Sequence, residues 1–210
     1  MSLTNSTNPV IWALEGDRAV IVAQVDTPLS VGFYVKAGGV GDLMRSTTGH
    51  AILAHQTTDV SSRAVQLWSQ HNGARPPRDL DLHLSKIKER GYEERESYEV
   101  EGVINISFPV FDDRGHAIAG LSVPFLQRIG DQTTPVTVRR VLKEASSLLS
   151  EAMGGPLVSW HTPQQSSILR IFPAARDSFA GTKMPQMLPA EGHTFLHIAR
   201  ACRERDSHIL

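Results

Sequence analysis

The clearest hydrophobic pattern in the chain alternates between apolar and small polar residues over positions 104–125. Every second residue from Ile104 to Val110 is apolar, and the alternation resumes from Ala117 to Val123. A polar break at 112–115 separates the two runs, and its Gly115 can take a positive φ at little cost. The pattern therefore predicts two antiparallel strands joined by a tight turn, with one aliphatic face.

The opposite face of this predicted hairpin is neither solvent-like nor purely apolar. It carries Asn105, Ser107 and Ser122 next to Phe111 and Gly120. Small polar groups among apolar ones are typical of a pocket that orients a small polar molecule. Sheet residues that only hydrogen-bond to their neighbours would give the same pattern, so both interpretations stay open.

The rest of the chain predicts a mixed α+β domain with an antiparallel sheet. Residues 10–14 and 19–25 form strand-like runs on either side of a Gly-Asp turn, and 31–35 is a third candidate strand. Apolar residues at helical spacing and flanking cap residues predict four helices, at 49–55, 59–70, 79–90 and 135–153.

Three hydroxyl residues, Ser46, Thr47 and Thr48, precede the first predicted helix. Any of them can cap it by accepting a backbone N–H bond, and capping alone explains one or two of them. The free N–H groups at the helix start, with the Thr47 and Thr48 hydroxyls, would also suit a carboxylate.

Composition and charge limit the classes of partner. The 210 residues carry a formal net charge of −1, so there is no polybasic field to hold nucleic acid. Cys202 is the single cysteine, which excludes an internal disulfide framework and fits a reducing compartment. No stretch approaches the ~20 apolar residues of a membrane span, and the N-terminus lacks signal-peptide features. The charge leads us to expect that the chain binds DNA poorly on its own. The single cysteine and the lack of a membrane span or signal peptide lead us to expect a cytoplasmic protein.

Two segments resemble a known family. The first is the hairpin, in which E-G-V-x-x-I-S-x-P-V-F-D is followed, after the Gly turn, by A-x-A-G-L-S-V-P; the second is D-L-M-R-S-T-T-G-H-A-I-L-A at 42–54. In this order they resemble the C-terminal effector-binding domain of IclR-type bacterial transcription regulators. The likeness spans roughly positions 9–153.

The resemblance implies a GAF-like α+β fold. We expect no cofactor, no catalytic residue and no resident metal. The resemblance also implies a small organic effector, often a carboxylate, and self-association into a dimer or tetramer. DNA would be contacted only through a winged helix-turn-helix, for which the few residues before the first strand leave no room. The effector-binding residues that we expect are Met44, Thr47, Thr48, Gly49, Asn105, Ser107 and Ser122.

Two positions depart from the family pattern. His50 stands where many relatives have Lys, so no role carries over to it. Arg95 stands near the place of an acidic ligand-contacting residue, and an Arg there would favour an anionic effector. The five glutamates of 92–101 offer the simpler interpretation, in which Arg95 pairs with them at the surface.

We expect three segments: a disordered or cloning-derived start at 1–8, the effector-binding domain at 9–155, and an extension at 156–210 where the likeness stops. Within the extension, His193 and His197 are four apart on a helix-like run, a spacing that could hold a metal. Further ligands would be needed, and His161 or Cys202 are guesses. Packing of the extension on its own domain or on a partner subunit is the favoured interpretation.

Two alternative functions remain open. The first is a hydrolytic enzyme, which would need a carboxylate–His–Ser chain around Ser122, although no G-x-S-x-G, H-E-x-x-H, C-x-x-C or Walker motif is present. The second is a structural dimerisation domain without a ligand.

Overall fold

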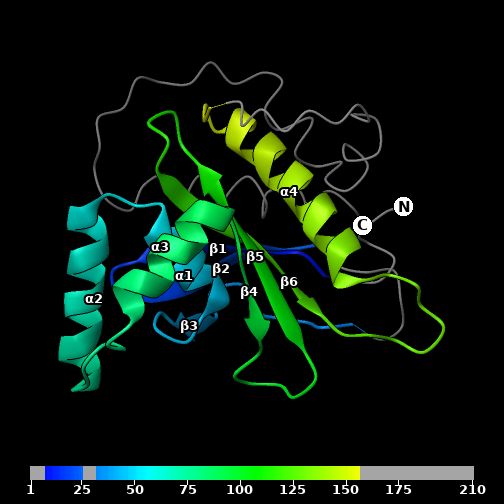
Figure 1. Ribbon diagram of the computed structural model, residues 1–210, viewed down its shortest axis with the longest axis horizontal. Helices are drawn as coiled ribbons and strands as arrows, with labels where there is room; N and C mark the ends of the chain where they lie inside the picture. The colour runs from blue at the N-terminus through cyan, green and yellow to red at the C-terminus, as the bar shows by residue number, and fades with distance from the viewer. Residues whose placement is uncertain (1–7, 26–31, 157–210) are drawn as a thin grey trace, which may run out of the picture.

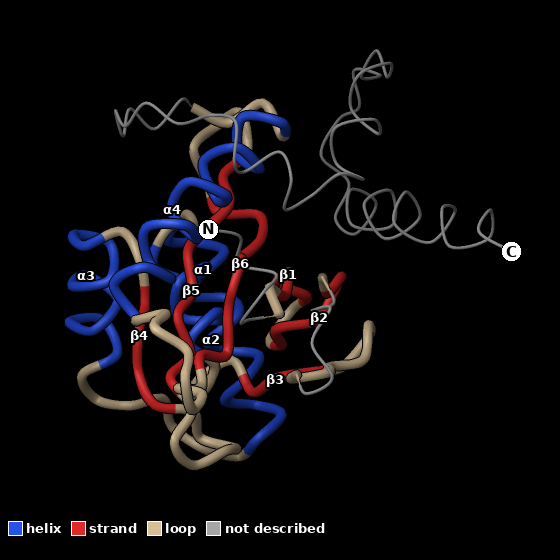
Figure 2. Tube along the Cα trace, turned by 90° about the vertical axis from the view of Figure 1, so that its right-hand side faces the viewer, coloured by secondary structure: helices blue, strands red, loops and turns tan. Residues whose placement is uncertain are grey.

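The computed structural model describes residues 8–25 and 32–156, which form an α+β domain around one antiparallel sheet. The six strands lie in the order β3-β2-β1-β6-β5-β4. Figure 2 shows β4, β5 and β6 side by side between α3 and the strands β1 to β3. The elements are β1 (Val10–Glu15), β2 (Arg18–Gln24), β3 (Val40–Asp42), α1 (Thr47–Ala54), α2 (Thr58–Asn72), α3 (Leu80–Arg90), β4 (Glu93–Glu96), β5 (Ile104–Phe111), β6 (Ala117–Phe125) and α4 (Pro135–Ala152).

The predicted central hairpin is confirmed. β5 pairs antiparallel with β6, and Ser107 lies opposite Ser122 in the register. Gly115 takes a φ of 76° in the turn, the left-handed conformation that glycine adopts without a Cβ clash. The alternation along both strands therefore divides their side chains between two faces, as the sequence pattern requires.

The aliphatic face of the hairpin packs against α4 (Figure 1). Pro135 begins this helix, where its missing N–H costs no hydrogen bond, and the Thr134 hydroxyl caps the end by accepting from Thr137 N. The helix buries one apolar stripe against β5 and β6, which makes the main core of the domain. Its fully or nearly fully buried members are Ile106, Phe108, Val110, Ala119, Leu121, Val123, Phe125, Val138, Val141, Leu142 and Ala145.

The polar face of the hairpin packs against α1. Gly120 makes this possible, because a Cβ at that position would lie 2.3 Å from Thr48 Cγ2. Gly49 is equally constrained, since a Cβ there would lie 2.9 Å from the Leu43 carbonyl oxygen. Every residue of α1 is buried, so this short helix is held inside the domain by its neighbours.

A second apolar cluster attaches α2 and α3 to the outer side of α1. Asp42 ends β3 and accepts hydrogen bonds from Trp68 Nε1 at 3.0 Å and from the Met44 backbone at 2.9 Å. These bonds fix the turn that leads into α1. The buried members of the cluster are Leu43, Met44, Leu53, Ala64, Trp68 and Leu80.

One predicted strand is wrong and another was missed. Residues 32–35 of the expected third strand are not in a ladder, because Gln24 occupies their backbone groups: its Nε2 donates to Phe33 O at 2.6 Å and its Oε1 accepts from Val35 N at 2.7 Å. The third strand is β3 instead. β4 was not predicted, because Glu93–Glu96 shows no apolar alternation. The expected 156–210 extension, including His193 and His197, lies almost wholly outside the described residues.

Candidate functional site

The start of α1 points at the polar face of the hairpin. The Ser46 hydroxyl caps the helix by accepting from Gly49 N at 3.1 Å, so Ser46 is the residue that takes the expected capping role. Thr47 and Thr48, which are 3% exposed, are thereby left facing inward. The first amides of any helix lack intrahelical acceptors, and this end carries the positive end of the helix dipole.

Four of the expected effector-binding residues converge on this face, but three of them already have polar partners there. Thr48 Oγ1 and Ser107 Oγ share a buried hydrogen bond of 2.9 Å. Ser122 Oγ accepts from Trp12 Nε1 at 3.2 Å. Asn105 lies half-buried at the start of β5, opposite Arg95 of β4. The paired hydroxyls stabilise the contact between α1 and the sheet.

The other expected residues support α1. Met44 is buried in the second apolar cluster, where it packs with α2 and α3 residues. Gly49 lies against the Leu43 backbone. Thr47 is different, because its buried hydroxyl has no hydrogen-bond partner among the described residues.

Two histidines lie near the start of α1: His50 belongs to the helix itself, and His83 packs against His50. His50 is 2% exposed, and neither of its ring nitrogens makes a hydrogen bond with the described part of the chain. His83 of α3 lies edge-to-face against it, with ring centroids 5.2 Å apart and planes at 70°, and its Nε2 is also buried without a hydrogen bond. Buried polar groups normally have partners, so the Thr47 hydroxyl and the His50 ring are exceptional, whereas His83 Nε2 lies within ion-pair distance of Glu93. We call Thr47, His50 and His83, with Arg95, the α1 polar site.

The electrostatics of the α1 polar site favour the binding of an anion. Burial lowers the pKa of His50 to about 3, and the positive charge of Arg95 and the neighbouring His83 add to the shift. The Met44 backbone lies close enough to oppose it slightly, although its geometry falls short of a hydrogen bond. His50 is therefore a neutral imidazole at physiological pH. Arg95 does not pair with the surrounding glutamates as expected; its guanidinium donates to the Arg45 carbonyl oxygen at 2.5 Å. A cation beside neutral donors favours a carboxylate or another small anion.

A buried carboxylate lies behind the site. Glu93 is 1% exposed, and its Oε1 is 3.5 Å from His83 Nε2. Its other oxygen forms an ion pair with the Arg90 guanidinium. Glu93 thus contacts two residues of α3, His83 and Arg90.

Sequence reasoning gave His50 no role, did not single out His83, and preferred for Arg95 a surface pairing with glutamates that the structure does not show. A signal existed for His83, because Leu80, His83, Leu84 and Ile87 recur at helical spacing, which puts the histidine on the buried stripe of α3. β4 has no apolar alternation, so its sequence gives no such signal for Arg95.

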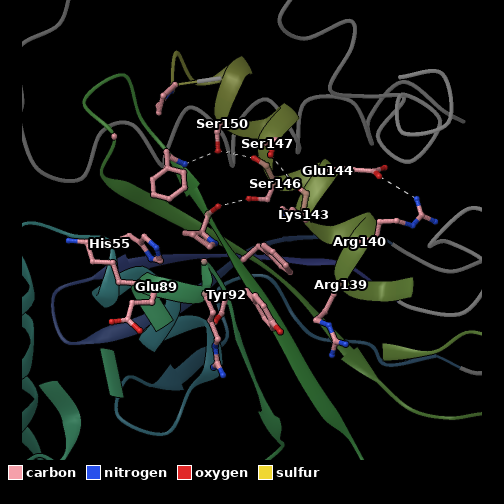
Figure 3. Close-up of a pocket in the computed structure, with 18 residues that line it drawn as sticks. His55, Glu89, Tyr92, Arg139, Arg140, Lys143, Glu144, Ser146, Ser147 and Ser150 are labelled. Atoms are coloured by element: carbon pink, nitrogen blue, oxygen red, sulfur yellow. Dashed lines mark hydrogen bonds and ion pairs between the residues drawn. The ribbon is translucent and has the colours of Figure 1, made fainter. Parts of the chain in front are cut away.

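A groove lies elsewhere, between α4 and the C-terminal end of α3, and none of the expected effector-binding residues lines it. Figure 3 shows His55, Glu89 and Tyr92 across from α4 residues such as Lys143 and Ser147. Its volume is about 730 Å³. Two of its three serines tie α4 to β5: Ser146 Oγ donates to Pro109 O, and Ser150 Oγ accepts from Phe111 N at 2.9 Å.

The chemistry of a hydrolase is not assembled at Ser122. Its hydroxyl contacts the Trp12 indole N–H rather than a histidine. In the part of the chain that the structure describes, no three His, Cys, Asp or Glu side chains are grouped to hold a metal ion. Within the same residues, no helix is both long enough and apolar enough to cross a membrane.

The chain belongs to the IclR family. The family described as Bacterial transcriptional regulator IclR C-terminal matches residues 5–151, so the resemblance seen in the sequence is confirmed. Members are transcription regulators rather than enzymes.

Individual relatives agree with this membership. HTH-type transcriptional regulator KdgR of Escherichia coli (strain K12) is 28% identical over 119 residues, which are 55% of this chain and 45% of KdgR. The match thus spans less than half of that relative.

Solved structures share the fold. IclR of Thermotoga maritima superposes with a TM-score of 0.58 at 24% identity, covering 71% of this chain and 62% of that one. An IclR homologue from Microbacterium hydrocarbonoxydans, complexed with 4-hydroxybenzoate, superposes with a TM-score of 0.54 at 19% identity, covering 69% and 59%. The expected α+β fold is therefore confirmed.

Proposed function

We propose that residues 9–155 are the effector-binding domain of an IclR-type regulator and that a small organic acid binds at the α1 polar site. In this proposal the protein is cytoplasmic, associates with copies of itself, and contacts DNA through a separate DNA-binding domain. Residues 1–8 and 156–210 lie outside the sensing unit.

The observation that carries the proposal is that the buried polar atoms of Thr47 and His50 make no hydrogen bond with the described residues, with His83 packed against His50. Burying a hydroxyl or imidazole without a hydrogen bond costs roughly 1–3 kcal/mol per group. A ligand that supplies the missing partners recovers this free energy on binding. Two such residues on one short helix are a recognised mark of a site that takes a ligand or an ordered ion.

The charges favour an acid over a neutral ligand. The carboxylate would accept from the Thr47 hydroxyl, the imidazole N–H of His50 and the Arg95 guanidinium. Asn105, opposite Arg95 in the strand register, can orient the remainder of the molecule. The complex of a homologue with 4-hydroxybenzoate, an aromatic acid, supports this class of ligand.

Thermal unfolding with added acids tests the proposal, with 4-hydroxybenzoate as the first probe and aliphatic 2-oxo acids as further probes. A bound acid should stabilise the protein by ~2.7 kcal/mol at a hundredfold excess over its dissociation constant. Arg95→Gln and Asn105→Leu should reduce this ligand-dependent shift, while Arg78→Gln, in the exposed linker before α3, should leave it unchanged.

Two results would contradict the proposal. If no acid shifts the melting temperature, the domain is a structural module. If an acid shifts wild type and Arg95→Gln equally, it binds somewhere other than the α1 polar site.

A further inference from the structure

The groove between α3 and α4 concentrates positive charge in a chain that is slightly negative overall. Five cationic and two acidic side chains line it, whereas the formal net charge of the whole sequence is −1. The cations are Lys88, Arg90, Arg139, Arg140 and Lys143, and the acids are Glu89 and Glu144.

These cations differ in how strongly they are neutralised. Arg90 pairs with buried Glu93, and Arg139 pairs with Glu94 at 2.7 Å. Arg140 is 57% exposed, and its 3.3 Å contact with Glu144 is a surface i,i+4 pair of small value. Lys88 is exposed on the last turn of α3. Lys88 and Arg140 therefore contribute a positive field at the mouth of the groove.

The floor of the groove is aromatic and rigid. Tyr92 stacks on Phe108, with ring centroids 5.1 Å apart and planes at 14°. The Arg90 and Arg139 guanidinium carbons lie 5.2 and 6.0 Å from the Tyr92 ring centroid. A groove with an aromatic floor and guanidinium groups beside it suits a protruding, negatively charged loop. A flat apolar surface would fit it less well.

The same chain carries a loop of that kind. Between β4 and β5 it runs E-S-Y-E-V-E-G at 96–102, and Glu96, Glu99 and Glu101 are exposed there. Val100, at 45% exposure, adds an apolar residue to the tip. None of these glutamates forms an ion pair with another described residue.

We propose that the acidic 96–102 loop of one copy of this chain docks in the basic α3–α4 groove of a second copy. The strand arrangement allows each copy to offer its loop to the groove of the other. β4 and β5 are antiparallel, so the loop lies at one end of the pair and groove residues Tyr92 and Phe108 lie toward the other. Two copies side by side in opposite directions place each loop at the other copy's groove, which gives a closed twofold dimer with two identical contacts.

This inference rests on the self-association part of the proposed function and does not require the proposed ligand site. Complementary charges raise the rate of encounter and fix the orientation of the partners, and their effect weakens as salt screens them. The dimer should therefore dissociate more readily at 1 M than at 0.1 M salt.

Charge reversal provides the experiment, with sedimentation velocity of the full chain as the readout. Lys88→Glu/Arg140→Glu reverses the groove, and Glu99→Lys/Glu101→Lys reverses the loop. Each variant alone opposes like charges in both contacts, so its dimer dissociation constant should rise about tenfold or more. In a one-to-one mixture both contacts again join opposite charges, so a heterodimer should form with near wild-type affinity.

Matched controls are Lys86→Glu on α3 and Glu15→Lys in the β1–β2 turn, both exposed and outside the two surfaces, and both should dimerise like wild type. The proposal is overturned if wild type is monomeric at concentrations on the order of 100 μM, if either reversed variant dimerises normally, or if the mixture stays monomeric. Recovery in the mixture excludes misfolding as the cause of dissociation. Ligand-dependent melting shifts should persist in the variants, which separates this test from that of the effector site.

Discussion

Thr48 and Ser107 are 59 positions apart in the chain and share one hydrogen bond at the centre of the molecule. The alternation of β5 and the hydroxyl cluster before α1 could be seen in the sequence, so both residues could be placed near one surface. That they would bond to each other could not, because it depends on how closely α1 approaches the sheet. The neighbouring unsatisfied atoms of Thr47 and His50 follow from the same approach.

The buried Thr48–Ser107 bond gives a prediction about stability. Thr48→Val should lower the free energy of unfolding by ~1–3 kcal/mol, because it leaves the Ser107 hydroxyl unsatisfied. Thr48→Val combined with Ser107→Ala should cost less than the sum of the single variants, since no orphaned hydroxyl remains. Urea unfolding of the four proteins measures the coupling, and strict additivity would show that the bond is absent in solution.

The lowered pKa of His50 predicts that the domain loses stability as the pH falls. Its folded pKa of about 3 lies below the ordinary value of 6.5, so the unfolded chain binds the extra proton as the pH falls through 6.5. This contribution to stability is complete above pH 6.5 and is lost progressively toward pH 3, by at most about 1.4 kcal/mol per pH unit.

The measurement is the unfolding free energy of wild type and His50→Gln between pH 7 and 4. The unfolding free energy of the variant should fall less steeply with decreasing pH than that of wild type. It should still fall, because burial also lowers the pKa of His55. Parallel curves would mean that His50 titrates normally in the folded protein.

At the scale of elements, the hairpin and the helices could be predicted because their sequences have apolar periodicity. β4 has none: its sequence is E-E-R-E, and it is held by pairing with β5 and by Glu93–Arg90 and Glu94–Arg139 ion pairs. Such a strand depends on tertiary context, and context also overrode the strand-like pattern at 31–35. Both the missed strand and the wrong strand thus have the same origin.

The packing of α1 on β6 through Gly120 predicts a specific clash and its relief. Gly120→Ala should destabilise the domain by ~1–3 kcal/mol, because the new methyl meets Thr48 Cγ2. Adding Thr48→Ser removes that methyl of Thr48 and keeps the hydroxyl, so it should restore most of the loss. Thermal melts of the single and double variants provide the measurement. If the double variant is no more stable than Gly120→Ala, the new methyl does not clash with Thr48 Cγ2.

At the scale of the whole molecule, the two proposed surfaces meet at α3. Its inner stripe presents His83 to the α1 polar site, and its last turn presents Lys88 and Arg90 to the groove. An effector can change self-association only if it binds the two assembly states with different affinity, and association then changes effector affinity by the same factor. α3 contributes side chains to both surfaces, so one helix can couple effector binding to self-association.

Glu93→Gln tests this route. The amide keeps the shape of the side chain but removes the charge that Arg90 and His83 share. Effector binding should persist, while its influence on the dimer dissociation constant should disappear. Sedimentation of the variant with and without a bound acid measures this influence, and an undiminished effect would show that the coupling bypasses Glu93.

The position of Glu93 has one more consequence. Its Oε1 faces the His83 imidazole and its Oε2 the Arg90 guanidinium, so a ligand that draws the imidazole away would leave the arginine as the main partner of the carboxylate. The groove would then become less positive and hold an acidic loop less tightly, without any displacement of the sheet. Evolution could reverse the response of such a regulator, from release to recruitment, by exchanging charges around this one side chain while leaving the fold untouched.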